Sequence, residues 1–490
     1  MSLINFCSLL ELHKKQIIQN QEVKNRQKHK KMAPQIELTT TLDQLYSLDG
    51  GNSKDIALVY AFPYQIQLAA SLPVSHKYAY QGPRTIKASK DDLARFYLGC
   101  LAQYYGFVAG PMDLHLFDLD EPVLKSAIDS TNVSQPARTH RIDAEDIFQQ
   151  LQVSQRPNLH FVEESKKVAA IDKQKAIITP MDFLDGNKPL VDQGAHWDLL
   201  SKRTLALSTL PSPPTDVIDS ILRPDQKDDE ALLETEIDRM LKRIALRPLP
   251  FVVKLPLGLG GHAVFMVKQE SQRQECLTIL HEELPSMFQS LTLENEAKKP
   301  VSLLIQDIVA GPSAGVSIFV TKAGRPVYIS TSAQILNERE QWNGGFMDYT
   351  TQEAQGELYH DIIVKVADYV WKRGYWGPMG IDVMTDQHGH QFIVDMNVRQ
   401  TGSYTLGLMK KHFYEQRNLP VGGLVCPLAV KGDRNSFEKQ FAKEIEDGTL
   451  VVAAWCHARG YSACGLLLGA ENRERMEVLM KGLESIAIKT

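Results

Sequence analysis

Residues 380–399 contain two aspartates, an asparagine and an arginine that could act together. Asp382 comes first, and Asp395, Asn397 and Arg399 follow at every second position. Two alternating runs flank a turn that contains Gly389, a composition typical of a β-hairpin. With a four-residue loop over 387–390, counting outward along the two strands pairs Asp382 with Asp395. The two carboxylates would then face each other across the ladder.

Period-two alternation predicts one polar and one apolar face for this hairpin. The polar face would carry Asp382, Met384, Ile393, Asp395, Asn397 and Arg399, and the apolar face Ile381, Val383, Phe392, Val394 and Met396. The alternative is an exposed hairpin whose charges are solvated.

The polar face has the chemistry of a cation site. Like charges directly opposite each other repel, so the paired carboxylates favour a cation between them. Asp382, Asp395 and Asn397 offer only oxygen ligands, which indicates a hard ion such as Mg²⁺, completed by nucleotide phosphates. Arg399, one step further along, could grip a phosphoryl group with its planar fork.

A glycine loop earlier in the chain follows a lysine. Residues 251–254 are typical of a strand that ends at Lys254, and Gly258, Gly260 and Gly261 come before a second apolar run. A Walker phosphate loop would need its lysine after the glycines. Glycines let backbone N–H groups approach phosphate oxygens, and Lys254 would add a point charge, although a plain tight turn is the alternative interpretation.

Between these two motifs, residues 303–320 predict a strand, a turn and a second strand. A chain crossing between two lobes here could present the backbone of Gln306 to Ile308 to a flat heteroaromatic base.

Together, these motifs resemble the ATP-grasp superfamily over roughly residues 195–410. The hairpin with its Asp-x-Asn-x-Arg run is the most specific part. The resemblance implies an α/β chain with an ATP-grasp fold that binds ATP and Mg²⁺. The residues implied to bind ATP are Lys202 on a helix, Lys254, Gly258, Gly260, Gly261, Gln306, Asp307, Ile308 and Ser313; those implied to bind metal are Asp382, Asp395 and Asn397; and those implied to be catalytic are Arg399 and Lys254.

Two positions depart from the family pattern. Gln306 stands where the family commonly has a glutamate at the adenine, and Ser313 falls where a second glutamate holds the ribose. An amide oxygen can still accept a hydrogen bond from the adenine amino group. Residues 341–346 and 412–490 look more like the secondary-metabolism peptide ligases of the superfamily, the pheganomycin-ligase type.

The resemblance implies an ATP-dependent carboxylate–amine ligase that works through an acyl phosphate and releases ADP and phosphate. Its partners would be ATP, two Mg²⁺ ions with Mn²⁺ as a substitute, a small carboxylic acid or amino acid, and an amine acceptor. Two alternatives keep the fold: a carboxylate–thiol ligase or an ATP-grasp kinase. A third is a nucleotide-binding regulatory protein without turnover.

The chain divides into four predicted segments. Residues 1–33 form a basic tail that we expect to be disordered, and 34–194 form an N-terminal α/β domain with a parallel sheet. Residues 195–411 hold the ATP-grasp lobes, and 412–490 a small C-terminal α/β subdomain. Within the lobes, residues 231–246 predict a helix with one apolar face, formed by Leu233, Ile237, Met240, Leu241 and Ile244.

The composition is that of a globular protein, with 43% apolar and 23% charged residues in 490. The 54 basic and 59 acidic residues create no field that would recruit nucleic acid. The six scattered cysteines favour reduced thiols and a cytoplasmic location, and Cys456, His457 and Cys464 lack the spacing of a zinc site. No apolar run is long enough for a membrane span. A homodimer is left open.

Overall fold

The computed structural model describes residues 35–61, 76–81, 92, 95–119, 140–258, 263–336, 342–458 and 460–488. The predictions for the tail at 1–33 and for Gly260 and Gly261 therefore lie outside the described residues. Within the described ranges, no helix is both long and apolar enough to cross a membrane.

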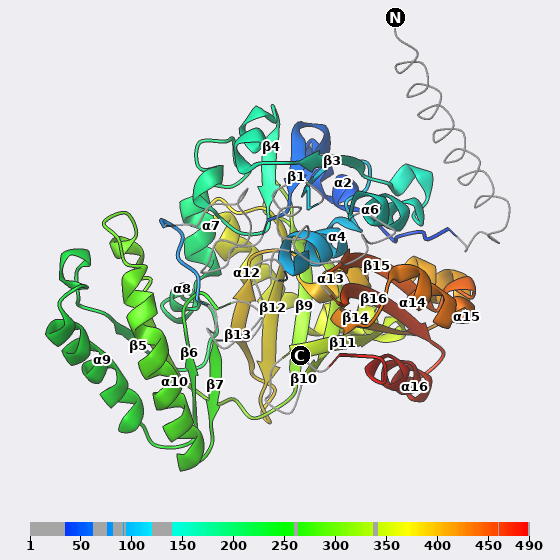
Figure 1. Cartoon of the computed structure of the whole chain (residues 1–490). Coiled ribbons are helices and arrows are strands. Elements are labelled where there is room, and N and C mark those ends of the chain that lie inside the picture. Colours follow the sequence, from blue (N-terminus) through cyan, green and yellow to red (C-terminus); the bar gives the residue numbers. More distant parts are fainter. Residues whose placement is uncertain are drawn as a thin grey trace, which may run out of the picture.

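The N-terminal segment contains a four-stranded, fully parallel sheet, as the alternation of strands and helices predicts. Its strand order is β3-β2-β1-β4 (Figure 1). The elements are α2 (Leu42–Tyr46), β1 (Ile56–Val59), a π-helical turn (Arg95–Leu101), α4 (Ala102–Gly106), β2 (Asp113–Phe117), α6 (His140–Gln149), β3 (Asn158–Val162) and β4 (Gln174–Ile177).

A second, antiparallel sheet has the order β5-β8-β6-β7 and packs under two long helices, α9 and α10 (Figure 1). Its elements are β5 (Thr215–Asp219), α9 (Glu230–Ala245), β6 (Phe251–Lys254), β7 (Val264–Val267), α10 (Glu270–Gln289) and β8 (Ser302–Asp307). The predicted apolar face of α9 is confirmed, because Ile237, Met240, Leu241 and Ile244 are buried and Leu233 packs against the same core.

The third sheet has eight strands in the order β13-β12-β9-β10-β11-β14-β16-β15. Its strands are β9 (Ser313–Val320), β10 (Pro326–Leu336), β11 (Trp342–Asp348), β12 (Gly377–Thr385), β13 (Gln391–Asn397), β14 (Val421–Val430), β15 (Leu450–His457) and β16 (Ser462–Ala470). The helices between them are α11 (Gln352–Leu358), α12 (His360–Trp371), α13 (Gly402–Gly407), a π-helical turn (Lys411–Glu415), α14 (Arg434–Gln440) and α15 (Ala442–Glu446), and α16 (Arg473–Glu484) follows the last strand. The strands after residue 412 thus continue the central sheet, and the boundary at 411 stays a prediction.

Two short helices join the N-terminal sheet to the other two, namely α7 (Gln193–Leu200) and α8 (Lys202–Ala206). Ser201 is the residue between them, so Lys202 opens the second helix. The carbonyl of Pro256, beside the glycine loop, accepts a hydrogen bond from the Lys202 backbone N–H at 2.8 Å.

The connection between β8 and β9 passes close behind the β12–β13 hairpin at Gly311. Its φ is +151°, and a Cβ built at this position would lie 1.8 Å from the backbone oxygen of Thr385. Only glycine fits here without moving the hairpin backbone.

We expect Gly311→Ala to lower the free energy of unfolding by about 1–3 kcal/mol, because the added methyl group forces backbone atoms apart. Gly482→Ala is the matched control, since a Cβ there meets nothing within 4 Å and the position lies in α16. That variant should be neutral or more stable by up to about 1 kcal/mol. Urea unfolding followed by circular dichroism measures both, and equal effects of the two substitutions would contradict this account.

Candidate active site

The β12–β13 hairpin brings Asp382 opposite Asp395, as the sequence predicts, but by a different route. The innermost pair is Thr385 with Gln391, which makes the loop one residue longer at its start than predicted. A β-bulge then places the extra residue Val394 between the pairs Val383–Ile393 and Asp382–Asp395. The longer loop shifts the register by one residue and the bulge restores it.

The bulge also corrects the predicted faces. Ile393 pairs with Val383 in the core, where both side chains are fully buried, and so does not belong to the polar face. Phe392 pairs with Met384, and both are half-buried. Strict alternation fails because it cannot register an inserted residue.

Two backbone groups freed by the bulge gain new partners. The N–H of Ile393 donates to the carbonyl of Pro211 at 2.7 Å. This bond holds the proline-rich segment 210–214 against β13, which is an edge strand. The carbonyl of Val394 accepts a hydrogen bond from Lys254 Nζ at 2.6 Å. The irregularity therefore fixes the lysine of the glycine-loop strand beside the two carboxylates.

A second lysine reaches the same place from α8. Lys202 Nζ lies 3.1 Å from Asp395 Oδ1 and 3.4 Å from the carbonyl oxygen of Gly258. The side chains of Lys202 and Lys254 are both largely buried. Lys202 thus contacts both Gly258, the first glycine of the loop, and Asp395 of β13, and so connects two sheets.

The charges of this cluster are strongly coupled. Burial lowers the pKa of Lys254 to about 8, against the opposing pull of Asp395. Burial, followed by repulsion from Asp395, raises the pKa of Asp382 to about 7. Burial also disfavours ionisation of Asp395, but Lys202 and Lys254 outweigh it and lower its pKa. One carboxylate is therefore neutralised by lysines while the other lacks full compensation.

Asn397 and Arg399 complete the polar row. Asn397 Nδ2 donates to Asp382 Oδ2 at 3.4 Å, and Asn397 Oδ1 accepts from Arg399 Nη2 at 3.1 Å. Arg399 Nη1 donates to the carbonyl of Gln400, while Arg399 Nε is buried with no partner among the described residues. This nitrogen is an unused donor beside the carboxylates, available to an anionic ligand.

The donor set fits Mg²⁺. Two carboxylates and an amide supply hard oxygen ligands on one patch, and Asp382 is only partly compensated by the lysines. A rotation of the Asn397 side chain exchanges its amide oxygen and nitrogen and would turn the oxygen toward Asp382.

The predicted adenine segment lies at the end of β8. Gln306 is 5% exposed, and its Nε2 donates to Thr215 Oγ1 at 2.9 Å. Asp307 is ion-paired with Arg247, and Ile308 directly follows the strand. Ser313 begins β9 and pairs with Met384 of the hairpin. The amide of Gln306 is therefore engaged within the sheet, and its contact with adenine stays a prediction.

Sequence reasoning missed two buried side chains that hold the turn around Arg399. His196 Nε2 donates to the carbonyl of Val398 at 2.7 Å. Gln400 is fully buried; its Nε2 donates to the carbonyl of Tyr105 at 3.0 Å, and its Oε1 accepts from Tyr60 Oη at 3.0 Å. Each contact joins residues roughly 200 or more positions apart, so no local pattern signals it.

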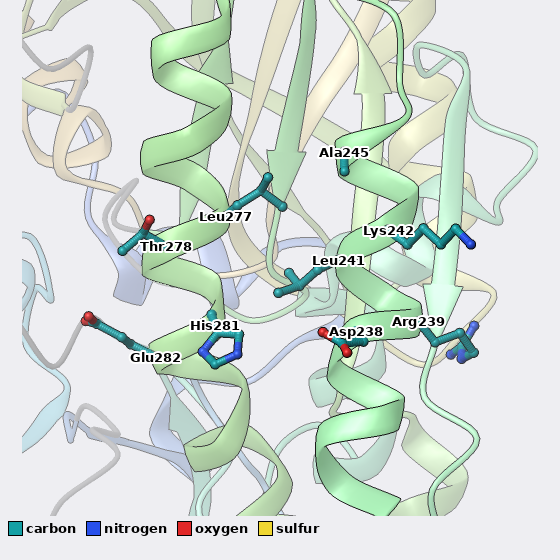
Figure 2. Close-up of a pocket in the computed structure, with 9 residues that line it drawn as sticks. All are labelled: Asp238, Arg239, Leu241, Lys242, Ala245, Leu277, Thr278, His281 and Glu282. Atoms are coloured by element: carbon teal, nitrogen blue, oxygen red, sulfur yellow. The ribbon is translucent and has the colours of Figure 1, made fainter.

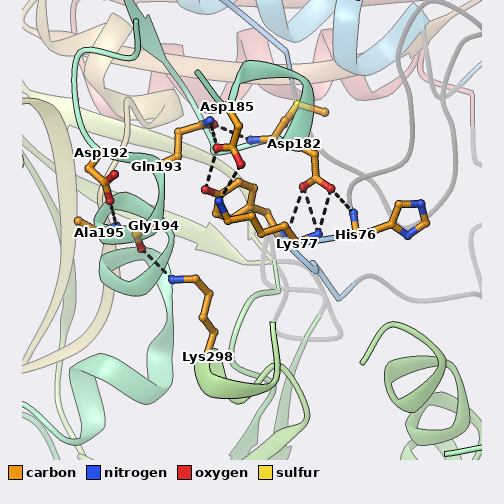
Figure 3. A network of polar contacts seen from close by, with 11 residues as sticks. His76, Lys77, Asp182, Asp185, Asp192, Gln193, Gly194, Ala195 and Lys298 are labelled. Carbon is orange, nitrogen blue, oxygen red and sulfur yellow. Dashed lines mark hydrogen bonds and ion pairs between the residues drawn. The ribbon is translucent and has the colours of Figure 1, made fainter. Parts of the chain in front are cut away.

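A short segment at residues 76–81, here called the strap, ties the N-terminal sheet to the glycine loop. Figure 3 shows the carboxylate of Asp182 accepting from the backbone N–H groups of His76 and Lys77, at 2.7 and 3.0 Å. At the other end, Gln81 Oε1 accepts from the N–H of Leu257 at 2.6 Å, and the Gln81 N–H donates to the Leu257 carbonyl. Gln81 therefore fixes the backbone one residue before Gly258.

A groove on the surface lies away from these residues. Figure 2 shows it between α9 and α10, with a volume of about 840 Å³. Asp238, Lys242, His281 and Glu282 are among the residues that line it, and none of the predicted site residues does. Its mixed charges present no convergent ligand set.

The family model described as the ATP-grasp domain matches residues 234–403. This part of the chain is an ATP-grasp domain. The match includes Lys254, the glycine loop and the whole hairpin through Arg399, and Lys202 lies before it.

Several solved structures resemble the chain at low identity. Phosphoribosylamine–glycine ligase from Thermotoga maritima has 11% identity and a TM-score of 0.48, covering 88% of this chain and 97% of that one. N5-carboxyaminoimidazole ribonucleotide synthetase from Thermus thermophilus has 11% identity and a TM-score of 0.46, covering 80% and 97%. L-amino acid ligase from Bacillus licheniformis has 12% identity and a TM-score of 0.43, covering 89% and 99%. The assignment of the domain rests on the family match.

His196 gives the turn before Arg399 a pH dependence. Burial lowers its pKa to about 4 from 6.5, so the folded chain keeps it neutral while the unfolded chain takes up a proton below pH 6.5. Stability from this group is present above that pH and is lost as the pH falls toward 4, by at most about 1.4 kcal/mol per pH unit. Urea unfolding of the wild type and of His196→Gln measures this effect between pH 7 and 4. As the pH falls, the free energy of unfolding of the wild type should decrease relative to that of His196→Gln. A difference independent of pH would contradict the assignment.

Gln81→Leu should loosen the base of the glycine loop, because the Leu257 N–H loses its acceptor. We expect the Leu257 amide to exchange with deuterium about tenfold faster, because a tenfold change corresponds to the net free energy of about one hydrogen bond. Gln155→Leu is the matched control, since the side-chain oxygen of Gln155 likewise accepts from a backbone N–H, that of Leu38, away from the glycine loop. If Gln81→Leu left the exchange rate of the Leu257 amide unchanged, the strap would have no role in holding the glycine loop.

Proposed function

We propose that this chain is an ATP-dependent carboxylate–amine ligase that forms an amide or peptide bond through an acyl phosphate and releases ADP and phosphate. The observation that supports it most is the facing pair Asp382 and Asp395, with Lys202 and Lys254 against it and the unused donor of Arg399 beside it. The ATP-grasp domain at residues 234–403 supports the nucleotide half of the proposal.

Each residue has a proposed role in binding ATP. Lys202 and Lys254 neutralise phosphate oxygens as point charges, and the loop from Gly258 through Gly260 and Gly261 covers them with backbone N–H groups. Bound Mg²⁺, of which we propose two ions, would supply further charge neutralisation, with Asp382, Asp395 and Asn397 as its ligands. Gln306, Asp307 and Ile308 are proposed at the adenine and Ser313 near the ribose.

The proposed chemistry has two steps that balance. A substrate carboxylate oxygen attacks the γ-phosphorus and ADP leaves, which gives an acyl phosphate. An amine nitrogen then attacks the acyl carbonyl, the C–O bond to phosphate breaks, and the amine loses a proton. Arg399 holds the transferred phosphoryl through its guanidinium, and closure of the glycine loop excludes water from the reactive acyl phosphate.

The finer parts of the hypothesis are proposals as well. They comprise the pheganomycin-type placement among secondary-metabolism peptide ligases, the cytoplasmic location, a homodimer, and an amino acid or small acid as the substrate. The buried, disulfide-free state of the five described cysteines agrees with a reducing compartment.

Product analysis tests the reaction class. The purified chain is incubated with ATP, Mg²⁺, pooled amino acids and small acids, and nucleotide products are separated by chromatography. Formation of ADP and phosphate, together with a hydroxamate when hydroxylamine is added, supports the ligase. AMP and pyrophosphate would reject it, and ADP without any hydroxamate would favour a kinase.

Asp395→Asn should lower kcat at least about 100-fold, since it removes a carboxylate of the proposed metal site. The melting temperature without ligand should change by only a few degrees. Asp368→Asn, at an exposed ion pair on α12, is the control that should keep full activity. Loss of folding in Asp395→Asn would instead assign the carboxylate a structural role.

A further inference from the structure

Three side chains with metal-binding groups converge on the N-terminal sheet, outside the ATP-grasp domain. Asp113 and His115 lie on β2, and His160 lies on the neighbouring strand β3. One ligand atom from each lies within 4.8 Å of the other two. His115 and His160 are register partners, and their rings stack at 4.6 Å between centroids.

The spacing of the donor atoms is close to that of ligands around a single ion. His160 Nε2 lies 3.5 Å from Asp113 Oδ1. Two ligands at about 2.0–2.1 Å from a tetrahedral zinc ion are about 3.3 Å apart. The His115 ring, which stacks on that of His160, offers a nitrogen within 4.8 Å of a ligand atom of each of the other two residues.

The surroundings hold the carboxylate in a suitable orientation. Lys173 Nζ lies 2.7 Å from Asp113 Oδ2, which leaves Oδ1 turned toward His160. Asn158 Nδ2 approaches Oδ1 at 3.3 Å and takes only one of its two lone pairs. An outer partner on the second oxygen of a ligating carboxylate is a common feature of metal sites.

The two histidines differ in their environment. His115 is 9% exposed, and none of the described residues donates or accepts a hydrogen bond at its ring. The side chain of His160 is 48% exposed, so an ion can enter from solvent. The convergence of this largely buried imidazole with a second histidine and a carboxylate is the arrangement that a bound metal ion requires.

We propose that Asp113, His115 and His160 bind one divalent transition-metal ion of the zinc class, which links β2 to β3 at the start of the parallel sheet. Two imidazole nitrogens and one carboxylate oxygen suit zinc, cobalt and nickel rather than magnesium or calcium. A water molecule takes the fourth position. The site shares no residue with the proposed ligase site and does not depend on its reaction.

Zinc binding to the full chain tests the proposal. The metal-free protein, without a histidine tag, is dialysed against Zn²⁺ with Mg²⁺ in excess to fill hard oxygen sites. We expect the wild type to bind one equivalent more than His160→Gln, with more than about a 100-fold loss of affinity in the variant. Asp113→Asn should lose the same equivalent. Co²⁺ added to the wild type should give the visible absorption of a tetrahedral complex.

His281→Gln is the matched control, because His281 lies 3.2 Å from Glu234 on another surface, with no third ligand grouped with them. It should bind like the wild type. His160 is largely exposed, so His160→Gln should keep the metal-free melting temperature of the wild type and lose only its rise with Zn²⁺. Equal zinc binding by the wild type and His160→Gln would overturn the proposal. So would loss of the extra equivalent in Asp395→Asn instead, which would place the ion in the ligase site.

Discussion

The ATP-grasp domain is organised around two like charges held on neighbouring strands. Asp382 and Asp395 are directly opposite each other, a pairing that weakens a sheet unless other groups compensate it. Lys202 and Lys254 provide that compensation unevenly, since they lower the pKa of Asp395 while the pKa of Asp382 stays raised. The remaining imbalance at Asp382 supports the cation site that we propose here.

The compensation depends on contacts that are distant in sequence. Lys202 comes from a short helix, Lys254 from the second sheet, and the carbonyl that anchors Lys254 is exposed by the bulge at Val394. The bulge thus does more than correct the register of the hairpin. It also brings the carbonyl oxygen of Val394 against Lys254, so that this oxygen becomes part of the charge cluster.

Sequence reasoning succeeded where the signal was local. The facing pair Asp382–Asp395, the lysine at the end of a strand and the apolar face of α9 follow from residue spacing within a few positions. It placed Ile393 on the wrong face because an inserted residue leaves no mark on the alternation of side chains.

It also missed every contact made across the fold. Nothing near Gln400 or His196 predicts their partners, because Tyr105 and Val398 lie roughly 200 or more positions away along the chain. The residues for adenine and ribose remain predictions for a related reason. Their recognition depends on how the two lobes meet, and Gln306 has an alternative partner in Thr215.

The strap gives the N-terminal sheet a part in the architecture of the nucleotide lobe. A fragment that began at residue 195 would keep the ATP-grasp domain intact in sequence, yet it would remove the acceptor of the Leu257 amide and the Tyr60 and Tyr105 partners of the Gln400 side chain. Chimeras that exchange the first segment between proteins of this kind would therefore have to carry Tyr60, Gln81 and Tyr105 along with it.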